Sequence, residues 1–232
     1  AVSDARTDIF ARIRHGTGGT PAETVATELA GIGAGPSAAL PCEEPCTAFL
    51  TNVLKNQGTI NVARNRSETV KAVADYVYQR YRSHKIVAGS DPRLAALPWR
   101  DAGLLPRFGA AANGEPAALS YARLGIAETG SVVTFTGKAN PATNNLLAED
   151  HMVIVHTEDL VVTLDQAWSR HNAAIEGHRP RGINNISRPS STADIAMHLV
   201  LGAHGPRRWH VILAGEVPSD AMAEAQKLAG SA

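Results

Sequence analysis

The chain has 232 residues, of which 44% are hydrophobic, and its 22 basic and 22 acidic side chains give a formal net charge of zero. This length suits one α/β domain or a domain with a small appendage, and the apolar content suffices for a buried core. A neutral chain offers no general basic field, so we expect no nucleic-acid partner. No run approaches the ~20 apolar residues of a membrane-spanning helix, and residues 1–13 lack the apolar centre of a signal peptide. We therefore expect a cytoplasmic protein without a membrane span.

The only two cysteines, Cys42 and Cys46, lie four positions apart. They resemble half of a metal or cluster site, but structural zinc and iron–sulfur sites use about four ligands, and the sequence has no second cysteine pair. Two reduced thiols are the favoured interpretation. We expect no metal and no cofactor in this chain.

The first forty residues read as a helical arm rather than as core. Ile9, Phe10 and Ile13 have the spacing of one helical face within residues 4–14, and a second helix is expected up to Leu29. A linker of small residues follows at 31–41. The expected organisation is a helical arm and linker over residues 1–40 and an α/β domain over 41–232. The chain is compatible with a homo-oligomer in which the arm packs on a neighbouring copy.

Helices alternate with short β-rich runs after residue 45. The expected helices are 46–56, a long one capped by Ser67, and 160–172, and the expected strands are 59–63, 85–89, one near Leu104, 131–136 and 151–156. A polar, exposed loop is expected at 171–181. This alternation predicts an α/β fold, a mostly parallel sheet covered by helices on both faces.

Residues 183–214 predict a strand, a helix and a second strand. A strand at 183–187 enters a turn at 189–192, and Ser191 with Asp194 looks like the start of a helix that ends at Gly202. Backbone N–H groups at such a helix start, beside several hydroxyls, suit a phosphate or carboxylate. The alternative is a well-capped helix without a ligand.

Four segments resemble the LUD-domain family in that family's order. They are G-I-A-E-T-G-S-V-V at 125–133, L-L-A-E-D-H at 146–151, S-R-P-S-S-T-A-D-I at 187–195 and L-G-A-H-G-P at 201–206. The resemblance implies a three-layer α/β fold of the sugar-isomerase/CoA-transferase type, whose ligands lie at the carboxyl ends of strands. It also implies a subunit for L-lactate utilisation, which would bind and assemble with iron–sulfur proteins that oxidise L-lactate to pyruvate. The clusters would then belong to those partners.

The resemblance implies a small anionic ligand held where two turns open into one pocket. Glu128 is the candidate general base. The candidate ligand-binding residues lie in the two turns and in the loop after Gly202, and they are Thr129, Gly130, Ser131, Arg188, Ser190, Ser191, Thr192, His204 and Gly205. A structural interpretation remains open, in which Glu128 stabilises a turn and Gly130 allows a tight entry into the strand.

The sequence departs from the family at several positions. Arg188 stands where the family usually has glycine, Ala148 replaces a proline, and Asn144 or Asn145 falls where the family often shows arginine. Arg188 would either pair with the bound anion or fill its space.

Two other interpretations remain. One is a stand-alone isomerase, transferase or ligase-like enzyme that acts on a phosphorylated or carboxylated small molecule, and the other is a domain that only scaffolds. Asp194, His198, His204 and His210 are close enough in sequence to suggest a metal site, but capping and helix-surface roles explain Asp194 and His198 better.

Overall fold

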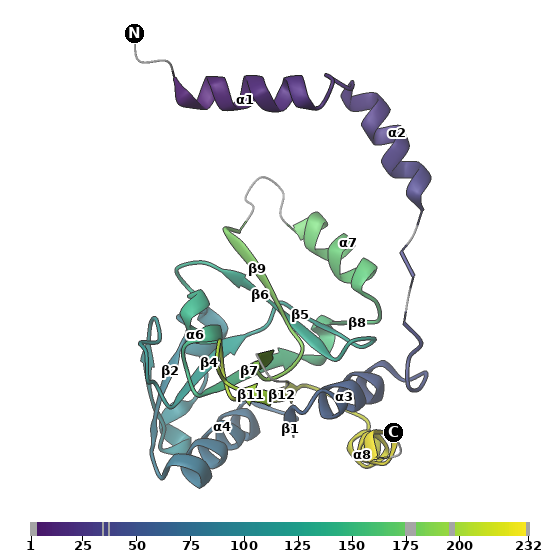
Figure 1. Ribbon diagram of the computed structural model, residues 1–232. Helices are drawn as coiled ribbons and strands as arrows, with labels where there is room; N and C mark the ends of the chain where they lie inside the picture. Colours follow the sequence, from purple (N-terminus) through teal and green to yellow (C-terminus); the bar gives the residue numbers. More distant parts are fainter. Residues whose placement is uncertain (1–3, 34, 37, 175–179, 195–197, 231–232) are drawn as a thin grey trace. The chain divides into compact units, whose positions relative to one another are not determined.

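The computed structural model describes residues 4–33, 35–36, 38–174, 180–194 and 198–230 (Figure 1). The chain divides into two compact units, Ala1–Pro36 and Ser37–Ala232. The first unit holds α1 (Ala5–Gly16) and α2 (Ala22–Ile32), the two helices expected in the arm, and neither contributes a buried residue.

Six parallel strands form the central sheet of the second unit. Their order is β1 (Thr59–Ala63), β12 (Arg208–Ala214), β7 (Asp150–His156), β4 (Ala117–Tyr121), β2 (Lys85–Ala88) and β3 (Leu105–Phe108). Every described pairing within this sheet is parallel.

Helices cover both faces of the sheet because apolar residues of its central strands point to both faces. In β7, Met152 and Ile154 pack on the side of α4 (Arg66–Tyr81), and Val153 and Val155 pack on the other side. That other side is covered by α3 (Pro45–Lys55) and α8 (Ala221–Gly230) (Figure 1). The expected α/β fold with a mostly parallel sheet is confirmed. Short helical segments link the strands: α5 (Pro92–Ala95), η1 (Trp99–Ala102), α6 (Ala142–Leu146) and η2 (Thr157–Asp159).

The long helix α4 begins before the residue expected to cap it. Asn65, not Ser67, is the N-cap, and its side chain accepts a hydrogen bond from the Glu68 N–H at 2.9 Å. The Glu68 carboxylate in turn accepts a 2.8 Å hydrogen bond from the N–H of Arg64, the residue before the N-cap, so the arrangement resembles a capping box. This reciprocal pair explains why the helix starts at Arg66.

A second, four-stranded sheet was not expected from the sequence. Its order is β8 (Leu160–Val161), β5 (Leu124–Ile126), β6 (Ser131–Thr136) and β9 (Gly182–Ile186), and α7 (Leu164–Ala174) covers one of its faces. The prediction of a helix from residue 160 is wrong at its start, because Leu160 and Val161 pair with β5. The expected exposed loop at 171–181 is wrong for His171, which lies in α7 and is buried; residues 175–179 lie outside the described part.

The helix predicted to follow Ser191 is wrong. Ser191–Asp194 forms β10, which pairs antiparallel with β11 (His198–Leu201), and residues 195–197 lie outside the described part. The base of this hairpin is closed by a 2.9 Å hydrogen bond from the Gly202 N–H to the Ser190 carbonyl. Thr192 lies opposite Val200, and β-branched residues such as these favour β-strands. The pairing between the two strands therefore outweighs the helix-like spacing of apolar residues in this segment.

Among the described residues, no helix is both long enough and apolar enough to cross a membrane.

Candidate functional site

Two of the family-like segments, 187–195 and 201–206, contact each other near the amino end of β12. The Ser190 N–H donates to the Pro206 carbonyl at 2.8 Å. A Cβ on Gly205 would lie 3.2 Å from the Ser190 Cβ, so the two loops are in close contact. The loop before β10 and the loop after β11 therefore form one unit at the amino end of β12.

The turn between β5 and β6 lies at the same end of the small sheet. Val132, one residue after the turn, pairs with Ile186, the last residue before the 187–190 loop. Gly130 is at φ +60°, and a Cβ there would lie 2.5 Å from the backbone of Asn52 and of Val53 in α3. Only glycine fits this contact, which fixes the turn against α3.

A cavity of about 300 Å³ adjoins the Ser190 loop. It is lined by the end of α4, the amino ends of β1 and β12, and the two family-like loops; its lining residues are Gln57, Thr59, Tyr76, Arg80, Pro189, Leu201, Arg207, Arg208 and Trp209. We call it the arginine pocket. Pro189 of the loop before β10 and Leu201 at the end of β11 both line it.

The buried Asp150 carboxylate pairs with two of the arginines that line the arginine pocket. Its side chain is completely buried and lies 2.5 Å from Arg208 Nε and 3.2 Å from Arg80 Nε. The Tyr76 hydroxyl donates to the same carboxylate at 2.9 Å. Burial, reinforced by the Asp150 charge and hydrogen bond, raises the pKa of Tyr76, so this hydroxyl stays protonated and donates.

The pocket retains an excess of positive charge. Arg207 lies 3.6 Å from Glu149, and its side chain is 57% exposed. Three guanidinium groups thus face two carboxylates, which leaves one positive charge to attract an anion.

His210 supports the wall of the pocket without reaching it. Its ring stacks on Tyr76 with the centroids 4.1 Å apart, and its Nδ1 lies 2.8 Å from the Thr59 hydroxyl. Burial, with a smaller contribution from the Arg80 charge, lowers the pKa of His210 to about 4. The ring is therefore neutral near pH 7.

None of the predicted site residues lines the arginine pocket, although several lie in the loops beside it. Ser190 and Gly205 hold the two loops together. The Arg188 side chain is exposed and donates to the Ser191 hydroxyl, and His204 is exposed and does not line the pocket. Arg188 thus neither lines the pocket nor fills it.

Residues of the β5–β6 turn bond among themselves and to α3. The Thr129 and Ser131 hydroxyls share a hydrogen bond, and the Thr129 carbonyl accepts from Asn56 Nδ2 at 2.8 Å. Ser191 and Thr192 lie in β10, opposite Leu201 and Val200. The structure therefore brings the predicted turns to one region, but it does not direct these hydroxyls into the arginine pocket.

Glu128 faces α7 instead of the arginine pocket. Its Oε1 accepts a 2.6 Å hydrogen bond from the Leu164 N–H at the start of α7. Its Oε2 is buried, with no hydrogen-bond partner among the described residues. This geometry matches the structural interpretation of Glu128, with the carboxylate at the positive end of a helix.

The location of the pocket differs from the sequence-based expectation in two ways. Pro189 and Ser190 precede a strand that begins at Ser191, so no helix start presents N–H groups there. The pocket also lies at the amino ends of β1 and β12, because Thr59 and Arg208 are their first residues. A ligand at the carboxyl ends of the parallel strands was expected.

The other departures from the family pattern are buried and structural. Asn144 accepts from the Ala111 N–H at 2.7 Å and donates to the Gly109 carbonyl at 3.0 Å. Asn145 bridges Ser120 and Thr134. Ala148 is a buried core residue.

His151 joins the same buried network and has no contact with the arginine pocket. Its Nε2 lies 3.2 Å from the Ser120 hydroxyl, and burial lowers the pKa of His151 to about 4.

Cys42 and Cys46 are free, partly buried thiols. Burial raises the pKa of Cys46 to about 11, and the nearby Glu44 carboxylate adds to the effect. Within the described residues, no three His, Cys, Asp or Glu side chains are grouped as metal ligands. The side chains of Asp194 and His198, part of the metal set considered from the sequence, lie outside the described part.

Sequence reasoning missed the residues that give the pocket its charge. Tyr76 and Arg80 are four positions apart on α4 and so share a face. Arg207 directly precedes the buried strand β12 and Arg208 is its first residue, and Asp150 directly follows Glu149 in the L-L-A-E-D-H segment. The two adjacent arginines beside a family-like loop were the available signal.

Comparison with known proteins identifies the family. The chain matches the LUD domain over residues 110–214. It is 30% identical over 175 residues to lactate utilization protein C of Halalkalibacterium halodurans, which is 68% of this chain and 76% of that protein. The protein of the same name from Exiguobacterium sp. is 30% identical over 146 residues, 58% of this chain, and the aligned region spans 63% of that protein's length.

A solved structure supports the fold. A DUF162 family protein from Deinococcus radiodurans superposes with a TM-score of 0.52 at 18% identity, covering 72% of this chain and 94% of that one. Identity at this level bears on the fold alone. The sequence matches give the assignment: the chain belongs to the LUD-domain family of lactate utilization proteins.

Proposed function

We propose that this chain is a cytoplasmic subunit of an L-lactate utilisation system and acts with iron–sulfur partner proteins that oxidise L-lactate to pyruvate. Its own part is binding and assembly, and the clusters reside on the partners. The observation that supports the system is the 30% identity over two thirds of the chain to a protein named lactate utilization protein C.

The arginine pocket supports a small anion as the ligand of this subunit. Guanidinium groups bind carboxylates through two parallel hydrogen bonds, and Arg80, Arg207 and Arg208 line one cavity. Asp150 holds Arg80 and Arg208 in place, so they lose little further freedom on binding. A small carboxylate such as L-lactate fits this chemistry.

The helices of the first unit support an assembly role. They expose large apolar side chains: Ile9, Phe10, Ile13, Val25, Leu29 and Ile32. Apolar surface of this kind in a water-soluble protein marks an interaction site.

Growth on L-lactate tests membership of the system. Cells that lack this gene should fail to grow on L-lactate and grow normally on pyruvate, and the full chain should restore growth. A chain without residues 1–36 should be stable but should no longer copurify with the iron–sulfur proteins. Normal growth of the deletion strain on L-lactate would refute the assignment.

Ligand titration tests the pocket separately. L-lactate, pyruvate and phosphate should each be tested for a saturable rise in melting temperature, at constant ionic strength. Arg207→Gln should abolish the rise, because it removes the exposed member of the cluster. Arg82→Gln, an exposed arginine at the end of α4 that does not line the pocket, is the matched control. Equal responses in both variants would remove the pocket from the proposal.

The structure offers less support for a stand-alone enzyme. Proton transfer in the arginine pocket needs a titrating group there. The Glu128 carboxylate is engaged by the Leu164 N–H instead, and Tyr76 has a raised pKa. The subunit function is therefore the one we advance.

A further inference from the structure

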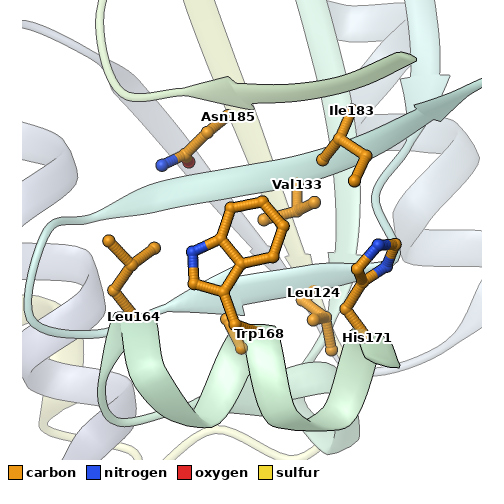
Figure 2. Close-up of a pocket in the computed structure, with 8 residues that line it drawn as sticks. Leu124, Val133, Leu164, Trp168, His171, Ile183 and Asn185 are labelled. Atoms are coloured by element: carbon orange, nitrogen blue, oxygen red, sulfur yellow. The ribbon is translucent and has the colours of Figure 1, made fainter. Parts of the chain in front are cut away.

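A second cavity lies between α7 and the small sheet, away from the arginine pocket. Figure 2 shows its apolar part, in which Trp168 of α7 lies between the helix and the strands. Leu124, Val133 and Ile183 of the sheet face the indole ring, and Leu164 and His171 flank it along α7 (Figure 2). We call this part the apolar slot.

A charged cavity adjoins the apolar slot and shares Leu124 and His171 with it. Its volume is about 120 Å³, and Arg93, Arg123 and Arg170 line it. We call it the charged mouth. The slot offers carbon surface at one end of the combined cavity, and the mouth offers three guanidinium groups beside the Asp159 carboxylate at the other end.

The arginines of the mouth are unequally paired. Arg93 binds Asp91 at 2.8 Å through Nη2, and Arg170 binds Asp159 at 3.1 Å. Within the described residues Arg123 has no ion pair, and its guanidinium carbon lies 5.5 Å from the centroid of the Phe135 ring. The mouth therefore has an exposed guanidinium group whose hydrogen-bond donors are free for an anion.

Aromatic rings form the junction between mouth and slot. The His171 ring meets the Phe135 ring edge-on at 4.6 Å and the Trp168 ring at 5.6 Å. The slot itself has only about 20 Å³ of free volume, room for about one water molecule. A chain would enter the slot only if the Trp168 indole, which is 45% exposed, moved outward.

We propose that this cavity binds a monocarboxylic acid with an apolar tail, with the carboxylate on Arg123 in the mouth and the tail in the slot. A guanidinium group next to an apolar cavity favours a carboxylic acid with an apolar tail over an inorganic anion. A phosphate would be attracted to the mouth but would leave the slot unused. A neutral apolar molecule would leave Arg123 without an ion-pair partner.

The site is separate from the arginine pocket, because the two cavities share no lining residue. It also goes beyond lactate, whose single methyl group is too short to use the slot. The inference is therefore independent of the proposed function and can fail without it.

Isothermal titration of the full chain with acetate, L-lactate and hexanoate, at matched ionic strength, tests the proposal. Affinity should rise with tail length by about fourfold for each methylene that becomes buried. Hexanoate should bind at least ten times more tightly than acetate. Inorganic phosphate should not compete with hexanoate at similar concentrations.

Variants separate the two ends of the cavity. Arg123→Gln should weaken hexanoate binding about tenfold, whereas Arg82→Gln, which removes an exposed arginine with a similar aromatic contact to Tyr78, should leave it unchanged. Ala167→Leu should fill the slot and weaken hexanoate binding but not acetate binding. Arg207→Gln, which changes the arginine pocket, should not affect hexanoate.

Three results would overturn the proposal. They are no saturable binding of hexanoate to the wild-type chain, equal affinity for acetate and hexanoate, or equal losses in Arg123→Gln and Arg82→Gln. Should Ala167→Leu fail to fold, the comparison of the two arginine variants decides the question, because both side chains are exposed.

Discussion

Asp150 and Arg208 are the first residues of two neighbouring parallel strands, and they pair in register with Arg208 Nε 2.5 Å from Asp150 Oδ1. This carboxylate is completely buried and also serves Arg80 and Tyr76. Because Asp150→Asn removes the carboxylate that two arginines and the Tyr76 hydroxyl share, it should lower the free energy of unfolding by about 3 kcal/mol. Urea denaturation measures this loss.

Asp75→Asn is the control for that change. Asp75 pairs with Lys71 on the exposed face of α4, where both side chains are more than half exposed. Its loss should cost under ~0.5 kcal/mol. Similar losses for the two variants would show that the Asp150 cluster is no more important than a surface ion pair.

Gly130→Ala should destabilise the protein strongly. The residue has φ +60°, and a Cβ would lie 2.5 Å from backbone atoms of α3. Separating the turn from α3 should cost more than ~2 kcal/mol. Gly137→Ala should be nearly neutral, because a Cβ there meets no atom within 4 Å. Thermal unfolding of the two variants gives the comparison, and a stable Gly130→Ala protein would contradict this account of the turn.

Glu128 should matter for stability rather than for proton transfer. Glu128→Ala removes the acceptor of the Leu164 N–H and should cost about 1 kcal/mol of unfolding free energy, whereas Glu128→Gln keeps an acceptor and should cost less. Complementation of the deletion strain provides the functional readout. If Glu128→Gln were stable but failed to support growth on L-lactate, the structural interpretation of Glu128 would be wrong.

Stability should fall as the pH drops from about 6.5 to 4. His151 and His210 have pKa values of about 4 in the folded chain, lowered from 6.5 by burial. Because the folded pKa is the lower one, the unfolded state binds protons first, so the stability present above pH 6.5 is lost as the pH falls through 4. The loss should approach roughly 3 kcal/mol for each histidine.

Urea unfolding between pH 7 and 4.5 measures that slope. His151→Gln should flatten it, whereas His15→Gln should leave it unchanged because His15 is exposed in α1. A slope that is the same in all three proteins would assign the acid sensitivity to other groups.

Cys46 should react slowly with alkylating reagents. Its pKa of about 11 lies about two units above the ordinary value of 9.0, and the thiolate is the reactive form. In a Cys42→Ser background, alkylation near pH 8 should be roughly 100-fold slower in the folded chain than in urea. The stability that comes with the neutral thiol is present below pH 9 and is lost as the pH rises through 11. Equal rates in the two states would contradict the raised pKa.

Local patterns predicted much of the parallel sheet. The strand at Thr59–Ala63 has the predicted bounds, and the expected long helix exists as α4, with Val70, Val73 and Val77 on its buried face. These elements carry their own periodicity and turn residues, so their structure depends little on distant partners. Prediction failed where pairing was non-local: Leu160–Val161 and Ser191–Asp194 are strands because β5 and β11 lie beside them.

The candidate site shows the same division between local and distant information. The family-like segments indicated two turns, and both lie at one end of the small sheet. The charges of the arginine pocket come from Arg80 of α4, Arg208 of β12 and Asp150 of β7, which are up to 128 positions apart. No spacing rule connects such residues.

The sequence alone determined the family, the α/β class and the periodic faces of its helices, because these properties are carried by motifs and by neighbours within one turn or one strand. Only the tertiary structure decided that Glu128 serves α7, that residues 191–194 are a strand, and that three arginines gather at the amino ends of β1 and β12. The physical reason is that burial and charge pairing are properties of groups brought together across the fold, and the free energy of those contacts exceeds the local preferences of a short segment.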